Sequence, residues 1–223
     1  MVAPIYNWSG FYIGLNGGGA SSRDCWGIHN VAGVELAATL NEGCHNATGA
    51  VVGGQVGYRW QSADWVFGVE AQGDWANLKG SNASLAAILY DNQTKVDAIG
   101  LFTAQLGYAW NNTLLYVKGG AAVTDNSYSS FFPVGNIFAA AFVPFNSASD
   151  TRWGGTVGAG VEYGFAPNWS VAVEYDHLFM GNPNIVFPAT AITTLRGEYI
   201  SQDVDMGTVR LNYRFGGPVV ARY

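Results

Sequence analysis

Two cysteines and two histidines lie close together in the first part of the chain. Cys25 and Cys44 are 19 positions apart in a polar, glycine-containing stretch, and His29 and His45 lie beside them. In an oxidising compartment the two thiols would form a disulfide that closes this stretch, and the alternative is a pair of free thiols in a loop. Two Cys with two His also resemble a metal-ligand set, but oxidised cysteines cannot bind a metal. We therefore expect a disulfide, no metal site and no cofactor.

Charged side chains occupy one face of a series of segments with period-two alternation. In one such segment Arg59 shares a face with Gln55, whereas Val56, Tyr58 and Trp60 share the other. The charges assigned to polar faces in this way are Arg59, Glu70, Asp74, Lys118, Glu162, Glu174, Asp176, Arg210 and Arg214. Five acids and four bases nearly neutralise one another, so if these faces meet we expect interleaved ion pairs and hydrogen bonds. The apolar faces carry one charge, Asp205, at the end of a segment.

Composition excludes several classes of protein. Of the 223 residues, 49% are hydrophobic, 14% aromatic and only 12% charged, against a usual charged share of about 25%. Such a chain is too apolar for disorder and too sparsely charged for an ordinary soluble surface. The formal net charge of −6 argues against nucleic acid, whose binding needs a basic face. No stretch of 18 apolar residues is present, which excludes helical membrane spans.

The alternation recurs eight times, each time over roughly the 9–11 residues that a tilted strand needs to cross a bilayer. We predict strands at about 11–20, 49–60, 65–77, 98–110, 114–124, 153–165, 169–180 and 204–215. Three connections are short and rich in turn-forming residues, and they alternate with four long ones. The sequence therefore predicts an all-β, eight-stranded, antiparallel up-and-down barrel. Its three short turns and both termini lie at one end, and its four long loops lie at the other.

Two kinds of barrel use such alternation, and aromatic residues distinguish them. A soluble lipocalin-like barrel turns its apolar face inward, whereas an outer-membrane barrel turns it to lipid. Ten aromatic residues fall at strand ends next to the short turns: Tyr58, Trp60, Trp65, Tyr108, Trp110, Tyr163, Phe165, Trp169, Tyr213 and Phe215. They form a belt at one membrane interface, and candidates for the second belt are Trp26, Trp75, Trp153 and Phe179. This distribution favours the transmembrane barrel.

Three segments carry a family resemblance. Residues 6–14 (YNWSGFYIG), 55–60 (QVGYRW) and 209–216 (VRLNYRFG) resemble the outer membrane immunogenic proteins of alphaproteobacteria, small porin-family barrels related to the opacity proteins. The resemblance spans all eight predicted strands and is strongest at the first and last. It implies a Gram-negative surface antigen in the outer membrane, exported through the periplasm with its signal peptide removed. Either Phe215 or the terminal Tyr223 would then serve as the assembly signal.

The histidine pattern argues against catalysis. Eight-stranded outer-membrane enzymes that act on lipid A use a His with a Ser and an acid near the outer rim. His177 lies on the predicted lipid face toward the long-loop end, and we expect no Ser or acid to partner it on that face. The sequence therefore predicts a protein that is not an enzyme.

The predicted long loops are unusually apolar for water-facing segments. The third contains Phe131, Phe132, Phe138, Phe142 and Phe145, and the fourth contains Ile185 and Phe187. One interpretation is that the loops pack on one another as a cap above the barrel. The other is that they contact neighbouring barrels or other surface proteins.

These observations lead to one interpretation with two alternatives. We divide the chain into a periplasmic segment (1–10), an outer-membrane barrel (11–215) and a periplasmic tail (216–223). We expect a structural and surface-interaction role, a lumen closed by ion pairs, and contacts with outer-membrane lipid and lipopolysaccharide. The alternatives are a small pore for ions or small solutes and a soluble ligand-binding barrel.

Overall fold

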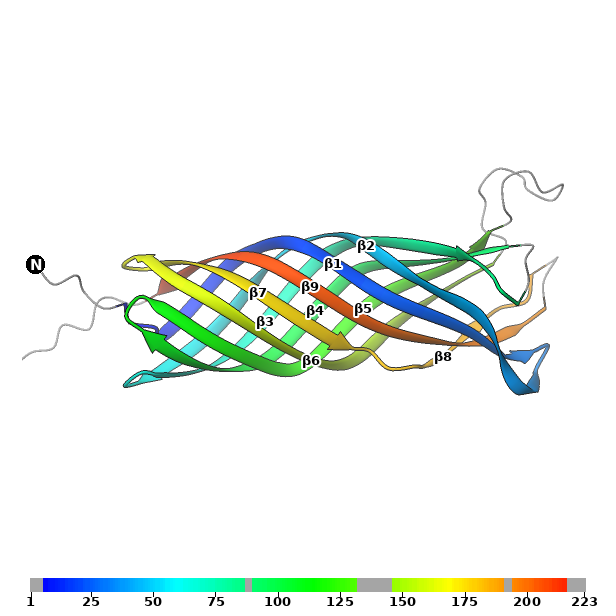
Figure 1. The fold of residues 1–223 in the computed structure, drawn as a ribbon, viewed down its shortest axis with the longest axis horizontal. Coiled ribbons are helices and arrows are strands. Elements are labelled where there is room, and N and C mark those ends of the chain that lie inside the picture. Colours follow the sequence, from blue (N-terminus) through cyan, green and yellow to red (C-terminus); the bar gives the residue numbers. More distant parts are fainter. Residues whose placement is uncertain (1–5, 87–89, 132–145, 191–193, 216–223) are drawn as a thin grey trace, which may run out of the picture.

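The computed structural model describes residues 6–86, 90–131, 146–190 and 194–215, which form antiparallel strands (Figure 1). The strands are β1 (Gly10–Val31), β2 (Val34–Ser62), β3 (Trp65–Ala83), β4 (Asp91–Trp110), β5 (Thr113–Phe131), β6 (Asn146–Ala166), β7 (Trp169–Phe179), β8 (Asn184–Phe187) and β9 (Arg196–Phe215). Within this part of the chain, no helix is long and apolar enough to cross a membrane.

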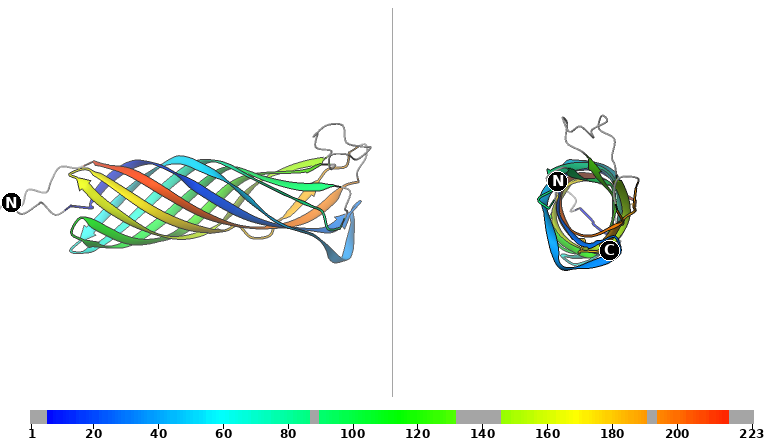
Figure 2. Two further views of the ribbon diagram at one scale, coloured as in Figure 1. Left: turned by 45° about the horizontal axis from the view of Figure 1, so that its top comes forward. Right: turned by 90° about the vertical axis from the view of Figure 1, so that its right-hand side faces the viewer.

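The eight long strands form a ring. Each strand from β1 to β6 pairs with the next, and β7 pairs with β9. β9 in turn pairs with β1, from Phe215 opposite Phe11 to Arg196 opposite Val31. The short β8 pairs with the outer part of β9. Figure 2 shows the ring along its axis, with residues 6–9 inside it. The predicted eight-stranded up-and-down barrel is confirmed.

The strands are longer than predicted. Except for β7 and β8, each has 19–29 residues, about twice what a bilayer crossing needs. The prediction of a long first loop is wrong, because β1 and β2 remain paired until a turn at Ala32 and Gly33. Outside the bilayer both faces of a strand are polar, so the alternation disappears while the backbone ladder continues. The barrel therefore projects beyond the membrane on the side opposite the short turns.

The three short turns occur where the sequence predicts them. They follow Ser62, Trp110 and Ala166, and each has two residues. Ala63 and Asn111 have φ angles of 54° and 52°, the left-handed conformation that tight hairpins require. These turns place one end of every hairpin at the same rim of the barrel.

The predicted aromatic belt faces outward at this rim, so the membrane-crossing part begins there. Trp75, Trp153 and Phe179 also point outward, at the opposite level. Trp26 does not belong to this second belt, because its side chain is 2% exposed and lies inside the barrel. Along β1 it shares the inward face of Tyr12 and Asn16. Outward aromatics and inward charges exclude the soluble lipocalin-like arrangement.

Candidate functional site

The interior of the barrel holds all nine charged residues predicted to face it, and each is buried. Five of them form a central charge cluster: Glu70, Lys118, Glu174, Asp176 and Arg210. Lys118 Nζ lies 2.7 Å from Glu174 Oε1, 3.2 Å from Asp176 Oδ1 and 3.6 Å from Glu70 Oε1. One lysine from β5 thus joins carboxylates from β3 and β7.

A second cation, Arg210, completes this cluster from β9. Its Nη2 lies 2.7 Å from Glu70 Oε2, and its Nη1 forms an ion pair with Glu174. Both glutamates are therefore shared between two cations. Because removing one partner of a buried pair leaves an uncompensated charge, the cluster behaves as a unit.

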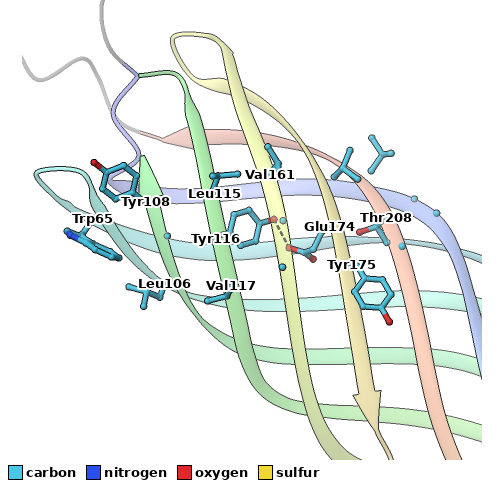
Figure 3. A pocket seen from close by; sticks show the side chains of 18 residues that line it. Trp65, Leu106, Tyr108, Leu115, Tyr116, Val117, Val161, Glu174, Tyr175 and Thr208 are labelled. Atoms are coloured by element: carbon cyan, nitrogen blue, oxygen red, sulfur yellow. Dashed lines mark hydrogen bonds between the residues drawn. The ribbon is translucent and has the colours of Figure 1, made fainter. Parts of the chain in front are cut away.

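The same glutamates accept hydrogen bonds from two tyrosines. The sequence interpretation did not identify these two residues. The Tyr12 hydroxyl donates to Glu70 at 2.6 Å. The Tyr116 hydroxyl donates to Glu174, also at 2.6 Å (Figure 3). The two halves of the barrel repeat this arrangement, with tyrosine on the first strand and glutamate on the third. The alternation along each strand was the signal that could have found these tyrosines, since Tyr116 shares the inward face of Lys118 and Tyr12 that of Asn16.

A separate ion pair lies nearer the short turns. Arg59 Nη1 is 2.8 Å from Glu162 Oε2, and its guanidinium lies 4.5 Å from the centre of the Tyr12 ring. Asn212 Nδ2 donates to Glu162 at 2.9 Å, and Ser170 also donates to this carboxylate. Glu162 thus has three donors although it is buried.

Asp74 and Arg214 differ from the other seven, because neither forms an ion pair with the residues that the structure describes. Asp74 accepts a hydrogen bond of 2.8 Å from Gln72 Nε2. Arg214 donates to the backbone oxygens of Ser9 and Pro167, each at 3.1 Å. The charges therefore do not pair one to one, and backbone oxygens take the place of a carboxylate at the rim.

The segment before β1 fills this rim. Trp8 is 2% exposed, and its backbone N–H donates to Gln61 Oε1 at 2.9 Å. Tyr6 packs against Trp8 with ring centres 4.4 Å apart. The cavity that remains among Tyr6, Trp8, Arg59 and their neighbours measures about 10 Å³, room for about one water molecule.

An apolar layer lies inside the barrel, toward its outer end. It is formed by Ala20, Ala47, Val51, Leu78, Val96, Ile99, Leu101, Ala122, Leu178, Met180, Val204 and Met206, all buried. The sequence interpretation missed this layer. The alternation of side chains along each strand could have revealed it. Leu101 shares the inward face of Thr103 and Gln105, and Met206 shares that of Arg210.

A further group of polar residues occupies the outer end, beyond the membrane-crossing part. Ser84 and Tyr90 donate to Glu42 Oε1 at 2.9 and 2.5 Å, and Asn92 donates to Glu42 Oε2 at 3.1 Å. Arg196 Nε lies 2.6 Å from Glu198 Oε1. Burial, reinforced by nearby Glu42 and opposed by Arg196, raises the pKa of Glu198 to about 8.

The predicted disulfide is present between Cys25 and Cys44. It joins directly opposed residues of β1 and β2 rather than closing a loop. The two histidines beside it are engaged elsewhere. His45 bonds to Asn82 and Thr94, and His29 bonds to Asn184 and stacks on Tyr199. Burial lowers the pKa of His45.

His177 has an acidic partner, so the expectation that none would face it is wrong. Its Nδ1 lies 2.7 Å from Asp205 Oδ1, which also accepts a hydrogen bond of 2.5 Å from the Tyr175 hydroxyl. The three residues lie on the outer surface of adjacent strands, because β7 and β9 pair His177 directly with Asp205. Within the described part of the chain, no hydroxyl or thiol bonds to His177 Nε2.

A groove of about 780 Å³ crosses the lipid-facing surface next to the Tyr175–His177–Asp205 group, and Tyr175 belongs to its lining (Figure 3). Its lining is almost wholly apolar and includes Leu106, Val117, Ala159, Tyr175 and Gly207. These five residues stand opposite one another on consecutive strands. The groove therefore runs across the strands, oblique to the barrel axis.

The aromatic loop residues are only partly described. Phe131 ends β5, whereas Phe132, Phe138, Phe142 and Phe145 lie outside the described residues. In the fourth connection, Ile185 and Phe187 of β8 are buried with Trp26, Tyr128 and Ile200. This part of the connection packs inward over the barrel.

Comparison with known proteins agrees with this architecture. The model of the outer membrane protein beta-barrel domain family matches residues 2–215. The chain belongs to this outer-membrane barrel family. The 31 kDa outer-membrane immunogenic protein of Brucella melitensis is 32% identical over 96% of this chain and 87% of its own. The 25 kDa outer-membrane immunogenic protein of Brucella abortus is 28% identical, over 96% of this chain and 82% of its own length.

Solved structures show the same fold for this outer-membrane barrel. The outer membrane protein OprG of Pseudomonas aeruginosa superposes with a TM-score of 0.59, at 15% identity over 95% of this chain and 99% of its own. The outer membrane protease OmpT of Escherichia coli superposes with a TM-score of 0.53, at 9% identity over 96% of this chain and 99% of its own. The outer membrane is thus the location, and the resemblance to the alphaproteobacterial immunogenic proteins is confirmed.

Proposed function

We propose that this outer-membrane barrel is not an enzyme, that its lumen is closed to ions and small solutes, and that its projecting outer end makes surface contacts. The observation that carries the closed lumen is the central charge cluster, in which Lys118 and Arg210 hold Glu70 and Glu174 across the barrel. The apolar layer beyond it would oppose the passage of ions, because a charge entering it would lose its hydration. Trp8 adds a third obstruction at the other end.

Conductance in planar bilayers tests the closed lumen. We expect purified wild-type protein to give no discrete conductance steps. Lys118→Ala with Arg210→Ala should leave the glutamates unpaired and admit water and cations, producing cation-selective steps. Val117→Ala, a lipid-facing neighbour of Lys118, is the matched control and should stay silent. If the wild-type protein gives conductance steps, and their ion selectivity changes in the Lys118→Ala, Arg210→Ala variant, the small-pore alternative is correct and this proposal is wrong.

The absence of an enzymatic role is supported by the arrangement at His177. A hydrolytic triad places histidine between the acid and the nucleophile. Here Tyr175 and His177 both bond to Asp205, so the acid is the central member. The Ser21 backbone lies opposite Asp205 on β1, on the side away from His177. Release of fatty acid from lipid A by wild type, lost in His177→Ala, would overturn the proposal.

The proposed contacts with other surface molecules would be made by the part of the barrel that extends past the membrane. β1 and β2 continue well beyond the outer aromatic belt, and Val34 and Leu40 are exposed there. Exposed apolar side chains in this position suit contacts with neighbouring barrels or other surface proteins. The phenylalanines of the third connection belong to the same proposal.

A further inference from the structure

We propose that the lipid-facing groove and the Tyr175–His177–Asp205 group form one binding site for a diacyl phospholipid with an ammonium headgroup. An acyl chain would lie in the groove and the ammonium group would bind Asp205. This inference is independent of the closed lumen, because every residue that it uses lies on the outside of the barrel.

The groove has the size and chemistry of an acyl-chain site. Its volume of about 780 Å³ lies within the range of ligand pockets, about 300–1,000 Å³. Val117, Val161 and Val173 form its walls, and its lining continues to Gly207 on β9. A Cβ placed on Gly207 would meet nothing within 4 Å, so this position leaves open space. A single chain can therefore lie against the strands without displacing any side chain.

The polar group adjoins one end of this groove. Tyr175 lines the groove and donates its hydroxyl to Asp205, which is two residues from Gly207 along β9. The outer-belt residue Phe179 lies two residues beyond His177 on β7, and the two rings are in edge contact with centres 4.4 Å apart. The group thus lies just inside the outer aromatic belt, at the level of lipid headgroups.

Charge selects the headgroup. Asp205 has a side-chain exposure of 53%, against 28% for His177. Within the described part of the chain, Tyr175 and His177 both bond to Asp205 Oδ1, which leaves Oδ2 to face a ligand. A carboxylate at this surface attracts an ammonium group and repels an anionic headgroup, and the neighbouring aromatic rings favour a cation as well. The site therefore suits phosphatidylethanolamine better than phosphatidylglycerol or lipid A.

Native mass spectrometry of the full chain tests this site. Protein in detergent would be mixed with phosphatidylethanolamine and phosphatidylglycerol of identical acyl chains, and the lipids that remain bound would be counted. We expect wild type to retain one phosphatidylethanolamine with about fivefold preference, the scale of one exposed charge pair. Asp205→Asn should remove the preference. Gly207→Leu should fill the groove and remove retention of both lipids.

A second lipid-facing groove provides matched controls. Gly73 and Asp125 line a groove of about 470 Å³, and Gly73 also has open space at its Cβ position. Gly73→Leu and Asp125→Asn should behave as wild type. Equal retention of the two phospholipids by wild type would overturn the proposal. So would a preference that survives Asp205→Asn, an equal loss in the control variants, or displacement of phosphatidylethanolamine by lipid A with Mg²⁺. If Gly207→Leu fails to fold, Asp205→Asn decides the result.

Discussion

Arg59 and Glu162 form an ion pair of 2.8 Å across the full width of the barrel. Their strands, β2 and β6, lie four positions apart in a ring of eight and are therefore on opposite walls. Both side chains are nearly inaccessible to solvent, with exposures of 4% and 1%. This pair ties together two walls that share no backbone hydrogen bonds.

Breaking this pair on one side should destabilise the barrel. Glu162→Gln leaves a buried arginine uncompensated, for which the usual loss is about 3–5 kcal/mol. Urea unfolding in detergent micelles, followed by tryptophan fluorescence, measures the loss. The double variant Arg59→Gln with Glu162→Gln should recover part of it, and an additive double variant would show that the two charges are not coupled.

The lipid-facing surface should reject charge. Val161 lies on the outer face next to Glu162, and Val161→Arg should cost about 2–4 kcal/mol in a bilayer. Val34→Arg is the matched control, because Val34 is 67% exposed beyond the membrane-crossing part and should be nearly neutral. Folding into lipid vesicles over a urea series compares the two. Equal stability of Val161→Arg and wild type would place this face away from lipid.

The disulfide should contribute modestly to stability. Cys25→Ser with Cys44→Ser should lower the free energy of unfolding by at most about 3 kcal/mol, the chain-entropy value for a loop of about 20 residues. The β1–β2 ladder holds the same two positions opposite each other without the bond. Alkylation of unreduced wild type should label no thiol, and two labelled thiols would show that the pair is not oxidised.

The outer end should lose stability as the pH rises. The pKa of Glu198 is raised in the folded state from 4.5 to about 8, mainly by burial. Folding therefore favours its protonated form, so this contribution is complete below about pH 4.5 and is lost as the pH rises toward 8. Unfolding midpoints in urea at pH 5 and pH 8 should differ less in Glu198→Gln than in wild type. The exposed Glu35→Gln is the control and should keep the wild-type difference.

The phenylalanines of the third connection should mediate association. Each buried aromatic side chain stabilises an interface by roughly 1.5–3 kcal/mol, so Phe138→Ser with Phe142→Ser and Phe145→Ser should abolish it. The barrel itself should remain intact, because its ladder does not depend on loop residues. Particle mass in nanodiscs and limited proteolysis measure the result. An unchanged mass with newly cleavable first and fourth connections would favour an intramolecular cap instead.

The number of strands in the ring, their polarity and the direction of their faces follow from the amino-acid sequence alone. Period-two alternation is a local property, so Val161 and Glu162 could be assigned to opposite faces from neighbouring residues alone. The short turns and the aromatic belt are equally local, and they established which end of each strand lies at which interface. If the alternation that places Tyr12 and Asn16 inward is continued along β1, it also places Trp26 inside the barrel.

Which side chains meet depends on how the strands close into a ring. The pairing of Arg59 with Glu162 depends on ring closure and register, which join residues more than a hundred positions apart. The extension of the strands past the membrane was hidden, because hydrophobic alternation requires lipid on one side and the outer part of the barrel has none. The partnership of Asp205 with His177 was hidden for a related reason, since it depends on the register between β7 and β9 rather than on any pattern within one strand.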